Sequence, residues 1–184
     1  MRKHRGLFQE NDMKIAITGT PGTGKTVAAE GLRRKGFEVM SVEQIIESHG
    51  IEKEYDEASD SYLVDTEELQ RIPLEGNTLF IEGHLSHYTD VDVIVVLRCH
   101  PAVLRERLLE RGYSEKKLTE NVMAEILDVI LVESLIRGKK VYEINTTGVS
   151  AEDVVGKLVG ITEGITDGLS PGRVDWSEEM TSWD

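Results

Sequence analysis

The sequence has a single cysteine, Cys99, and this scarcity excludes two kinds of site. One thiol cannot form a disulfide within the chain, and it cannot supply a zinc site that needs two or more thiolates. Such a composition fits a reducing compartment. We therefore expect a cytoplasmic protein.

Long apolar runs are also absent. No stretch approaches the roughly 20 residues that a membrane-spanning helix requires. Residues 1–12 contain basic side chains but no apolar core of the kind that a signal peptide has. We expect a soluble protein with no membrane partner.

Basic residues are few, because 21 Lys and Arg stand against 34 Asp and Glu, which gives a formal net charge of −13. Phosphate backbones repel such a chain, so direct general binding to nucleic acid is not expected. The acids are concentrated between Ser41 and Glu68, where ten of them accompany one base, Lys53. This segment is either a solvated face or a surface for a basic partner.

Predicted strands and predicted helices alternate along the sequence. Short β-branched runs predict strands, and segments of helical periodicity that end near glycine predict helices. The predicted strands cover residues 14–18, 37–40, 78–82, 91–97 and 140–145, and the predicted helices cover 25–35, 42–49, 101–112, 118–135 and 151–159. The alternation predicts an α/β fold with a parallel sheet of about five strands flanked by helices.

The remaining segments show no clear period. Residues 1–12 predict a flexible extension and residues 52–65 a loop with local structure. Residues 162–184, with six acids and one base, predict an acidic tail. A single domain over residues 13–161 is expected between the two ends.

The run from Gly19 to Thr26, GTPGTGKT, fits the pattern G-x-x-x-x-G-K-[ST] in full, after a predicted strand and at the start of a predicted helix. Glycines let successive backbone N–H groups point at phosphate oxygens, and the helix N-terminus adds a favourable dipole. Lys25, which we expect to be exposed in the empty site, would neutralise the β- and γ-phosphates, and the Thr26 hydroxyl would bind Mg²⁺. The alternative is a glycine-rich turn with a surface lysine, but the context favours a nucleoside-triphosphate site.

An acid at the end of a neighbouring strand would complete this site by holding the water shell of Mg²⁺. Glu82 closes the predicted strand 78–82, and ligands sit at the carboxyl ends of parallel strands. Asp60 and Asp65 are alternatives, and Glu82 could instead be an exposed strand-end acid. His84 is a candidate for positioning or deprotonating an attacking group, although His84 and His87 could equally be ordinary loop histidines.

Three arginines lie on the predicted helix that starts at Pro101. Arg107 and Arg111 are four residues apart and share a face, so their guanidinium groups could clamp phosphates as charge develops. The alternative is pairing with the helix acids Glu106 and Glu110, which we favour for Arg105.

Four runs together resemble the archaeal adenylate kinase-like proteins, whose eukaryotic relatives are the nuclear adenylate kinases, among them the coilin-interacting nuclear ATPase. The runs are GTPGTGKT, IEGH at 81–84, RLLERGYSEKKLTEN at 107–121 and AEILDVIL at 124–131. The resemblance covers about residues 13–160.

The resemblance implies a P-loop nucleoside-monophosphate-kinase fold with an NMP-binding segment at about 42–65 and a lid at about 110–120. It implies that Glu82 and His84 form the acid–histidine pair of the family, and that the loop 145–148 with Gly148 lies near the adenine. The resemblance also implies that ATP is contacted by the following residues: Gly22, Thr23, Gly24, Lys25, Thr26, Val27 and Arg111.

Two functions remain open on the sequence. The first is a nucleoside monophosphate kinase, AMP-preferring or of broad specificity, that also has ATPase activity and a link to maturation of the small ribosomal subunit (16S rRNA processing). The second is a nucleotide-switched assembly ATPase that binds a basic small-subunit ribosomal protein. The recognisable lid favours the first, and the absence of arginine from residues 42–65 favours the second. A kinase with a non-nucleotide acceptor is a weaker third reading.

Overall fold

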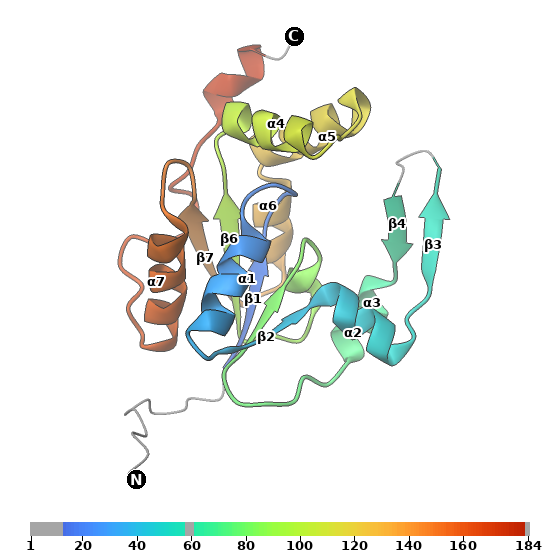
Figure 1. Cartoon of the computed structure of the whole chain (residues 1–184), viewed down its shortest axis with the longest axis vertical. Helices are drawn as coiled ribbons and strands as arrows, with labels where there is room; N and C mark the ends of the chain where they lie inside the picture. Colours follow the sequence, from blue (N-terminus) through green and yellow to red (C-terminus); the bar gives the residue numbers. More distant parts are fainter. Residues whose placement is uncertain (1–12, 58–60, 183–184) are drawn as a thin grey trace.

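Five strands form one parallel sheet at the centre of the molecule (Figure 1). They are β1 Lys14–Thr18, β2 Glu38–Ser41, β5 Leu79–Glu82, β6 Val93–Arg98 and β7 Lys140–Asn145. Their order across the sheet is β2-β5-β1-β6-β7, and every neighbouring pair is parallel. The α/β fold class predicted from the alternation is confirmed. This computed structural model describes residues 13–57 and 61–182, so the predicted extension over residues 1–12 lies outside the described residues.

Seven helices and two short 3-10 helices accompany the strands in the described part of the chain. They are α1 Lys25–Arg34, α2 Val42–His49, α3 Thr66–Arg71, η1 Ser86–Tyr88, α4 Pro101–Glu110, α5 Glu115–Ile126, α6 Val129–Ile136, α7 Ala151–Thr162 and η2 Ser177–Ser182. The described helices include none that is long and apolar enough to cross a membrane.

Helices cover both faces of the sheet because β1 and β6 carry apolar side chains on both sides. Ile15, Ile17 and Val95 pack on the face covered by α1 and α7. Ala16 and Ile94 pack on the opposite face, against α2, α3 and α6. The carboxyl ends of the strands are thereby left open to the loops that form the site.

A two-stranded antiparallel hairpin, β3 Lys53–Asp56 and β4 Ser61–Val64, projects from the domain as an arm beside α2 and α3 (Figure 1). The sequence predicted a loop with local structure here. The hairpin has no apolar alternation to reveal it, and Tyr55 pairs across the strands with Tyr62 at a ring-centroid distance of 5.4 Å. Helix α3, which was not predicted, begins where the Asp65 carboxylate accepts two backbone N–H bonds.

The predicted continuous helix over residues 118–135 is wrong, because it breaks between α5 and α6. Asp128 adopts a left-handed conformation with a φ of 56°. The cause is the buried Arg98, whose guanidinium donates both to the Asp128 carboxylate and to the backbone oxygen of Glu125. A buried arginine needs these acceptors, and the turn supplies them.

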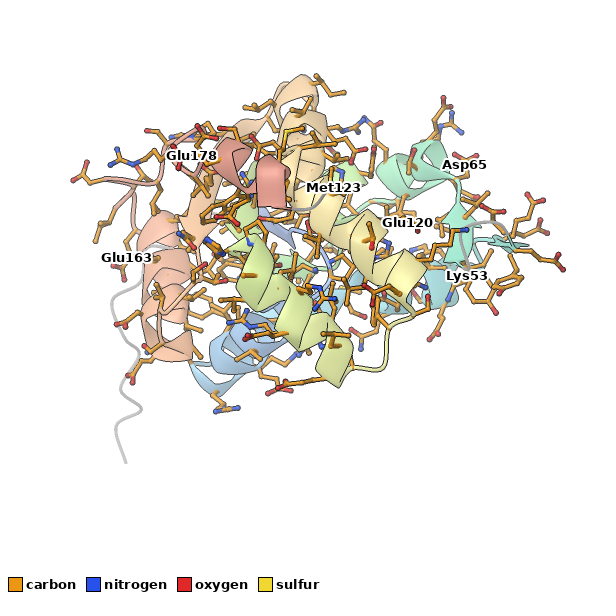
Figure 2. All side chains as sticks on the ribbon, turned by 90° about the horizontal axis from the view of Figure 1, so that it is seen from above. Lys53, Asp65, Glu120, Met123, Glu163 and Glu178 are labelled. Atoms are coloured by element: carbon orange, nitrogen blue, oxygen red, sulfur yellow. The ribbon has the colours of Figure 1, made fainter. Side chains whose placement is uncertain are left out.

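The described part of the predicted acidic tail is packed against the domain instead of extending freely. Leu169 is buried, and its carbonyl accepts a hydrogen bond of 2.9 Å from the N–H of Glu143 on β7. Trp176 then packs on the apolar cluster between α4 and α5. Figure 2 shows η2 beside the part of α5 that carries Met123. Leu169 and Trp176 are isolated apolar contacts in a polar segment. They form no periodic pattern, so the sequence did not reveal them.

Candidate nucleotide site

The glycine-rich loop joins β1 to α1 and lies at the carboxyl end of β1. A side chain at Gly19, where φ is 138°, would place its Cβ 2.4 Å from the backbone oxygen of Leu97. A Cβ at Gly22, where φ is 95°, would lie 2.8 Å from Leu104. Both positions therefore require glycine, and the loop can wrap closely around a group placed at the start of α1.

Lys25 is partly buried, which corrects the expectation that it would be exposed in the empty site. Its Nζ donates to the carbonyl of Gly19 at 2.7 Å and to the carbonyl of Thr20 at 3.0 Å. Burial lowers its pKa to about 8, while the nearby carboxylates of Glu82 and Glu125 act in the opposite direction. The ammonium group is held inside the loop by carbonyls, from which an anionic ligand can draw it.

A cavity of about 710 Å³ opens beside this loop. Of the predicted site residues, the cavity brings together Gly22, Gly24, Lys25, Thr26, Val27, Glu82, His84 and Arg111. It lies at the carboxyl ends of β1 and β5, where an open parallel sheet binds ligands.

A smaller cavity of about 330 Å³ shares Gly22, Gly24, Val27 and Arg111 with the first. Arg107 lines this one, and its guanidinium donates to the carbonyl of Gly22 at 3.1 Å. Its other walls include apolar side chains, which are those of Val27, Ala28, Val149, Ala151 and Val154. Such a recess suits a flat, largely apolar group attached to a phosphate chain.

Two of the predicted site residues, Thr23 and Gly148, do not line the larger cavity. Thr23 is buried in the loop, lines the smaller cavity, and donates through Oγ1 to the carbonyl of Thr20 at 2.9 Å. Gly148 lines neither, although its neighbours Thr146 and Val149 line the smaller cavity. The loop 145–148 thus reaches this recess through residues other than the glycine.

Carboxylates face the loop from the opposite wall of the larger cavity. The pKa of Glu82 is raised, first by burial and then by the nearby Glu43 carboxylate, while Lys25 opposes the rise. Asp65, the alternative acid, instead caps α3, and Asp60 lies outside the described residues. Glu82 is therefore the acid that lines the cavity from the end of the neighbouring strand.

His84 lines the larger cavity, and its backbone oxygen accepts a hydrogen bond from Thr18 Oγ1 at 3.2 Å. The pKa of its ring is lowered, first by loss of solvent and then by the charge of Lys25. A neutral imidazole at pH 7 can accept a proton or orient a water molecule. His87, by contrast, is buried behind the loop and contacts Thr18 and Glu133.

The oxygen donors of the larger cavity suit Mg²⁺. Thr26 is exposed at the start of α1, and the carboxylates of Glu43 and Glu82 repel each other at the same edge of the sheet. A hard divalent cation would relieve that repulsion, and Mg²⁺ commonly uses one or two carboxylates, water and substrate phosphates. The described residues contain no group of three His, Cys, Asp or Glu side chains that could form an all-protein cage. The residues present thus fit an ion that is held mainly by a phosphate ligand.

The end of α4 and the start of α5 form the third wall. Arg111 is exposed and borders both cavities, and Tyr113, Lys117 and Asn121 line the larger one. Arg105 pairs with Glu115 at 3.2 Å across the α4–α5 turn, whereas we had favoured the helix acids Glu106 and Glu110 as its partners. The cations that these helices bring to the two cavities are Arg107, Arg111 and Lys117.

Some cavity residues were not anticipated from the sequence. Glu43 is one of them, and it lies two residues beyond the end of β2, at the same sheet edge as Glu82. The rule that sites form at the carboxyl ends of strands, applied to the second strand, would have identified it. Asn121 and Ile130 carry no such signal, because only the packing of α5 and α6 brings them to the cavity.

Comparison with known proteins places these features in context. Residues 15–128 match a family described as an AAA domain. A protein of Archaeoglobus fulgidus named "Putative adenylate kinase" is 48% identical over 172 residues, which cover 91% of this chain and 94% of the relative. Proteins of the same name are 44% identical in Thermococcus onnurineus and 42% identical in Methanocaldococcus jannaschii, each covering 91% of this chain and 93% and 94% of the relative.

The fold is shared with a more distant solved structure. The shikimate kinase of Acinetobacter baumannii, in complex with shikimate, matches with a TM-score of 0.59 at 15% identity, over 84% of this chain and 95% of that one. At that identity the match concerns the arrangement of sheet and helices alone.

Proposed function

Because the chain belongs to the AAA domain family and to the group of archaeal proteins named "Putative adenylate kinase", we propose that it transfers the γ-phosphoryl group of ATP to a nucleoside monophosphate, with AMP preferred. The enzyme class is phosphotransferase. The finer assignment of donor and acceptor is supported by one observation above others: a single cavity joins the Lys25 loop, the Glu82–His84 wall and the Arg111 wall.

The geometry suits phosphoryl transfer without a covalent intermediate. Lys25 and the loop N–H groups would hold the β- and γ-phosphates, and Arg107 and Arg111 would border the nucleoside and phosphates of ATP. Mg²⁺, when bound, neutralises charge on the transferred group. Thr26 and Glu82 are the residues that would hold it, the latter through water.

An acceptor monophosphate needs cations around its phosphate, and the predicted NMP-binding segment has no arginine to provide them. Residues 42–65 contain none, and Glu43 from this segment adds a negative charge. Apart from Lys25, the Lys and Arg residues that line the larger cavity are Arg111 and Lys117, and both belong to the α4–α5 wall. We therefore assign the acceptor phosphate to this wall.

The test measures ADP production from ATP and Mg²⁺ with AMP, CMP, UMP or GMP, and with none of them. We expect AMP to raise the rate most, with a smaller rate of hydrolysis in its absence. A rate that no monophosphate changes would overturn the kinase proposal and leave an ATPase.

Substitutions at the carboxylate wall separate transfer from hydrolysis. We expect Glu82→Ala to lower both rates on the order of 10²-fold, because the Mg²⁺ shell serves both. His84→Ala should slow AMP-independent hydrolysis about tenfold more than transfer, since AMP is also held by other groups. Steady-state rates with and without AMP measure both effects. Equal and mild losses from both substitutions would remove this wall from the mechanism.

We propose, as a second role, that the chain acts in maturation of the small ribosomal subunit by holding a basic ribosomal protein, so that its nucleotide state governs that binding. The observation that favours it is the projecting arm. Glu52, Glu54 and Glu57 are exposed there beside Tyr55 and Tyr62, two residues that are 51% and 62% exposed. Charge attracts a basic partner and aromatic rings add contact area.

This second role predicts salt-sensitive binding, because exposed charges are screened beyond about 8 Å at physiological ionic strength. Converting Glu52, Glu54, Asp56 and Glu57 to their amides should abolish retention of ribosomal proteins in a pull-down at low salt. The control carries the same charge change elsewhere on the surface, at Glu30, Glu152, Glu163 and Asp167. Equal loss in both variants would indicate net charge alone, and no retention by the unaltered protein would leave only the kinase.

A cytoplasmic location belongs to this proposal. Cys99 is a free, buried thiol in the described chain, and burial raises its pKa. A thiol kept neutral and covered is inert in a reducing compartment.

A further inference from the structure

Glu125 of α5 is a buried carboxylate that lies directly beneath the glycine-rich loop. It is 2% exposed, and its Oε2 accepts a hydrogen bond of 2.6 Å from the hydroxyl of Thr20. Its Oε1 accepts from Arg98 Nε at 2.8 Å and from the N–H of Cys99 at 3.1 Å. One carboxylate thus connects three elements: the loop after β1, the end of β6, and α5.

Thr20 is the point at which this carboxylate reaches the phosphate site. The Thr20 carbonyl accepts from Lys25 Nζ at 3.0 Å, from Thr23 Oγ1 at 2.9 Å and from the Thr23 N–H at 3.2 Å. Fixing the Thr20 side chain therefore fixes the carbonyl that holds Lys25. Lys25 is thereby connected through Thr20 to a residue that lies a hundred positions away in the sequence.

The same helix carries cavity residues on the face that ends at Glu125. Lys117, Asn121 and Ala124 line the cavity, and Asn121 and Glu125 are four positions apart. Beyond Glu125 the helix is held by Arg98, which donates through Nη2 to the Glu125 carbonyl at 3.0 Å. The C-terminal end of α5 is therefore held both to the glycine-rich loop and to Arg98.

We propose that Glu125 is a positioning residue for phosphoryl transfer: acting through Thr20, it fixes the loop around Lys25 and ties that loop to the helix that carries the α4–α5 wall. The inference rests on the proposed function only in taking the glycine-rich loop as the ATP site. It does not depend on which acceptor is used.

Glu143 provides a matched control for the cost of disturbing a buried ion pair. It is also buried, and its Oε1 accepts from the same arginine, Arg98 Nη1, at 2.6 Å. Its Oε2, however, accepts from the N–H groups of Arg173 and Val174 and makes no contact with the loop. Glu143→Gln and Glu125→Gln should therefore destabilise the protein alike, but only the second should alter the site.

The experiment compares kcat and the KM for ATP in Thr20→Val, Glu125→Gln and the double variant. We expect each single change to lower kcat on the order of tenfold, since a small misplacement of a catalytic group is costly. The KM for ATP should change less than threefold. The double variant should be no slower than the slower single variant, because both changes break one connection. Thr20→Ser, which keeps the hydroxyl, should retain the original kcat.

The control variant is Glu143→Gln. Glu143→Gln should keep kcat within threefold while its melting temperature falls by about as much as that of Glu125→Gln. Equal kcat losses in Glu143→Gln and Glu125→Gln, full activity of Thr20→Val, or multiplied effects in the double variant would overturn the inference. If the unaltered enzyme hydrolyses ATP but transfers nothing to AMP, the kinase proposal fails, and the hydrolysis rates still decide the role of Glu125.

Discussion

Replacing Lys25 by alanine is expected to lower ATP turnover about 10³-fold while leaving the protein folded, because loss of one preorganised charged donor to a transferring group has an effect of this order. The Lys25 ammonium donates to two loop carbonyls and lines the cavity, so we expect the fold to survive its removal. Turnover is measured as ADP release with AMP present, and the fold by circular dichroism and melting temperature.

The control for this variant is Lys35→Ala, which removes an exposed lysine just beyond the other end of α1. It should retain full turnover. Near-normal turnover in Lys25→Ala would remove the glycine-rich loop from the mechanism. A melting temperature many degrees lower would instead mean that the buried ammonium has a structural role.

For Arg111→Ala we expect kcat to fall on the order of 10²- to 10³-fold, with only a few-fold loss in ATP affinity. An arginine beside a transferring phosphoryl group interacts most strongly when charge is redistributed in the transition state, so its removal affects kcat more than binding. Arg111 borders both cavities and its side chain is exposed, so it can contact phosphates that lie between them. Equilibrium titration with ATP and steady-state kinetics measure the two quantities separately.

Arg105→Ala is the matched control, because Arg105 lies on the same helix but pairs with Glu115. Its loss should change kcat little. An Arg111→Ala variant whose kcat is unchanged would show that this arginine serves the helix and not the reaction.

Local patterns in the sequence predicted the parts of the fold that local chemistry determines. The β-branched runs at 14–18 and 91–97 correspond to β1 and β6, and the helix predicted for 42–49 is α2 with the same bounds. Glu82 reaches the cavity because β5 lies beside β1, a placement that the usual topology of parallel sheets makes accessible to prediction.

What the sequence did not reveal depends on contacts between distant positions. The break at Asp128 is caused by Arg98, thirty residues earlier, and Thr20, whose carbonyl accepts from Lys25, is bonded through its hydroxyl to the distant Glu125. The acidic hairpin has one tyrosine on each strand where a core strand would have an apolar series. Periodicity cannot detect a single pair, and no local pattern identifies a buried ionic partner.

The packing of Leu169 against β7 bears on how the protein behaves at high concentration. An edge strand with unpaired backbone groups is a template on which another molecule can add a strand, and such pairing leads to aggregates. Here the Glu143 N–H is already bonded to Leu169, and the Glu143 side chain holds the N–H groups of residues 173 and 174. Release of this segment alone would uncover β7 while the rest of the sheet stays folded. Aggregation under mild heating should therefore begin from local opening at this edge, before the molecule as a whole unfolds.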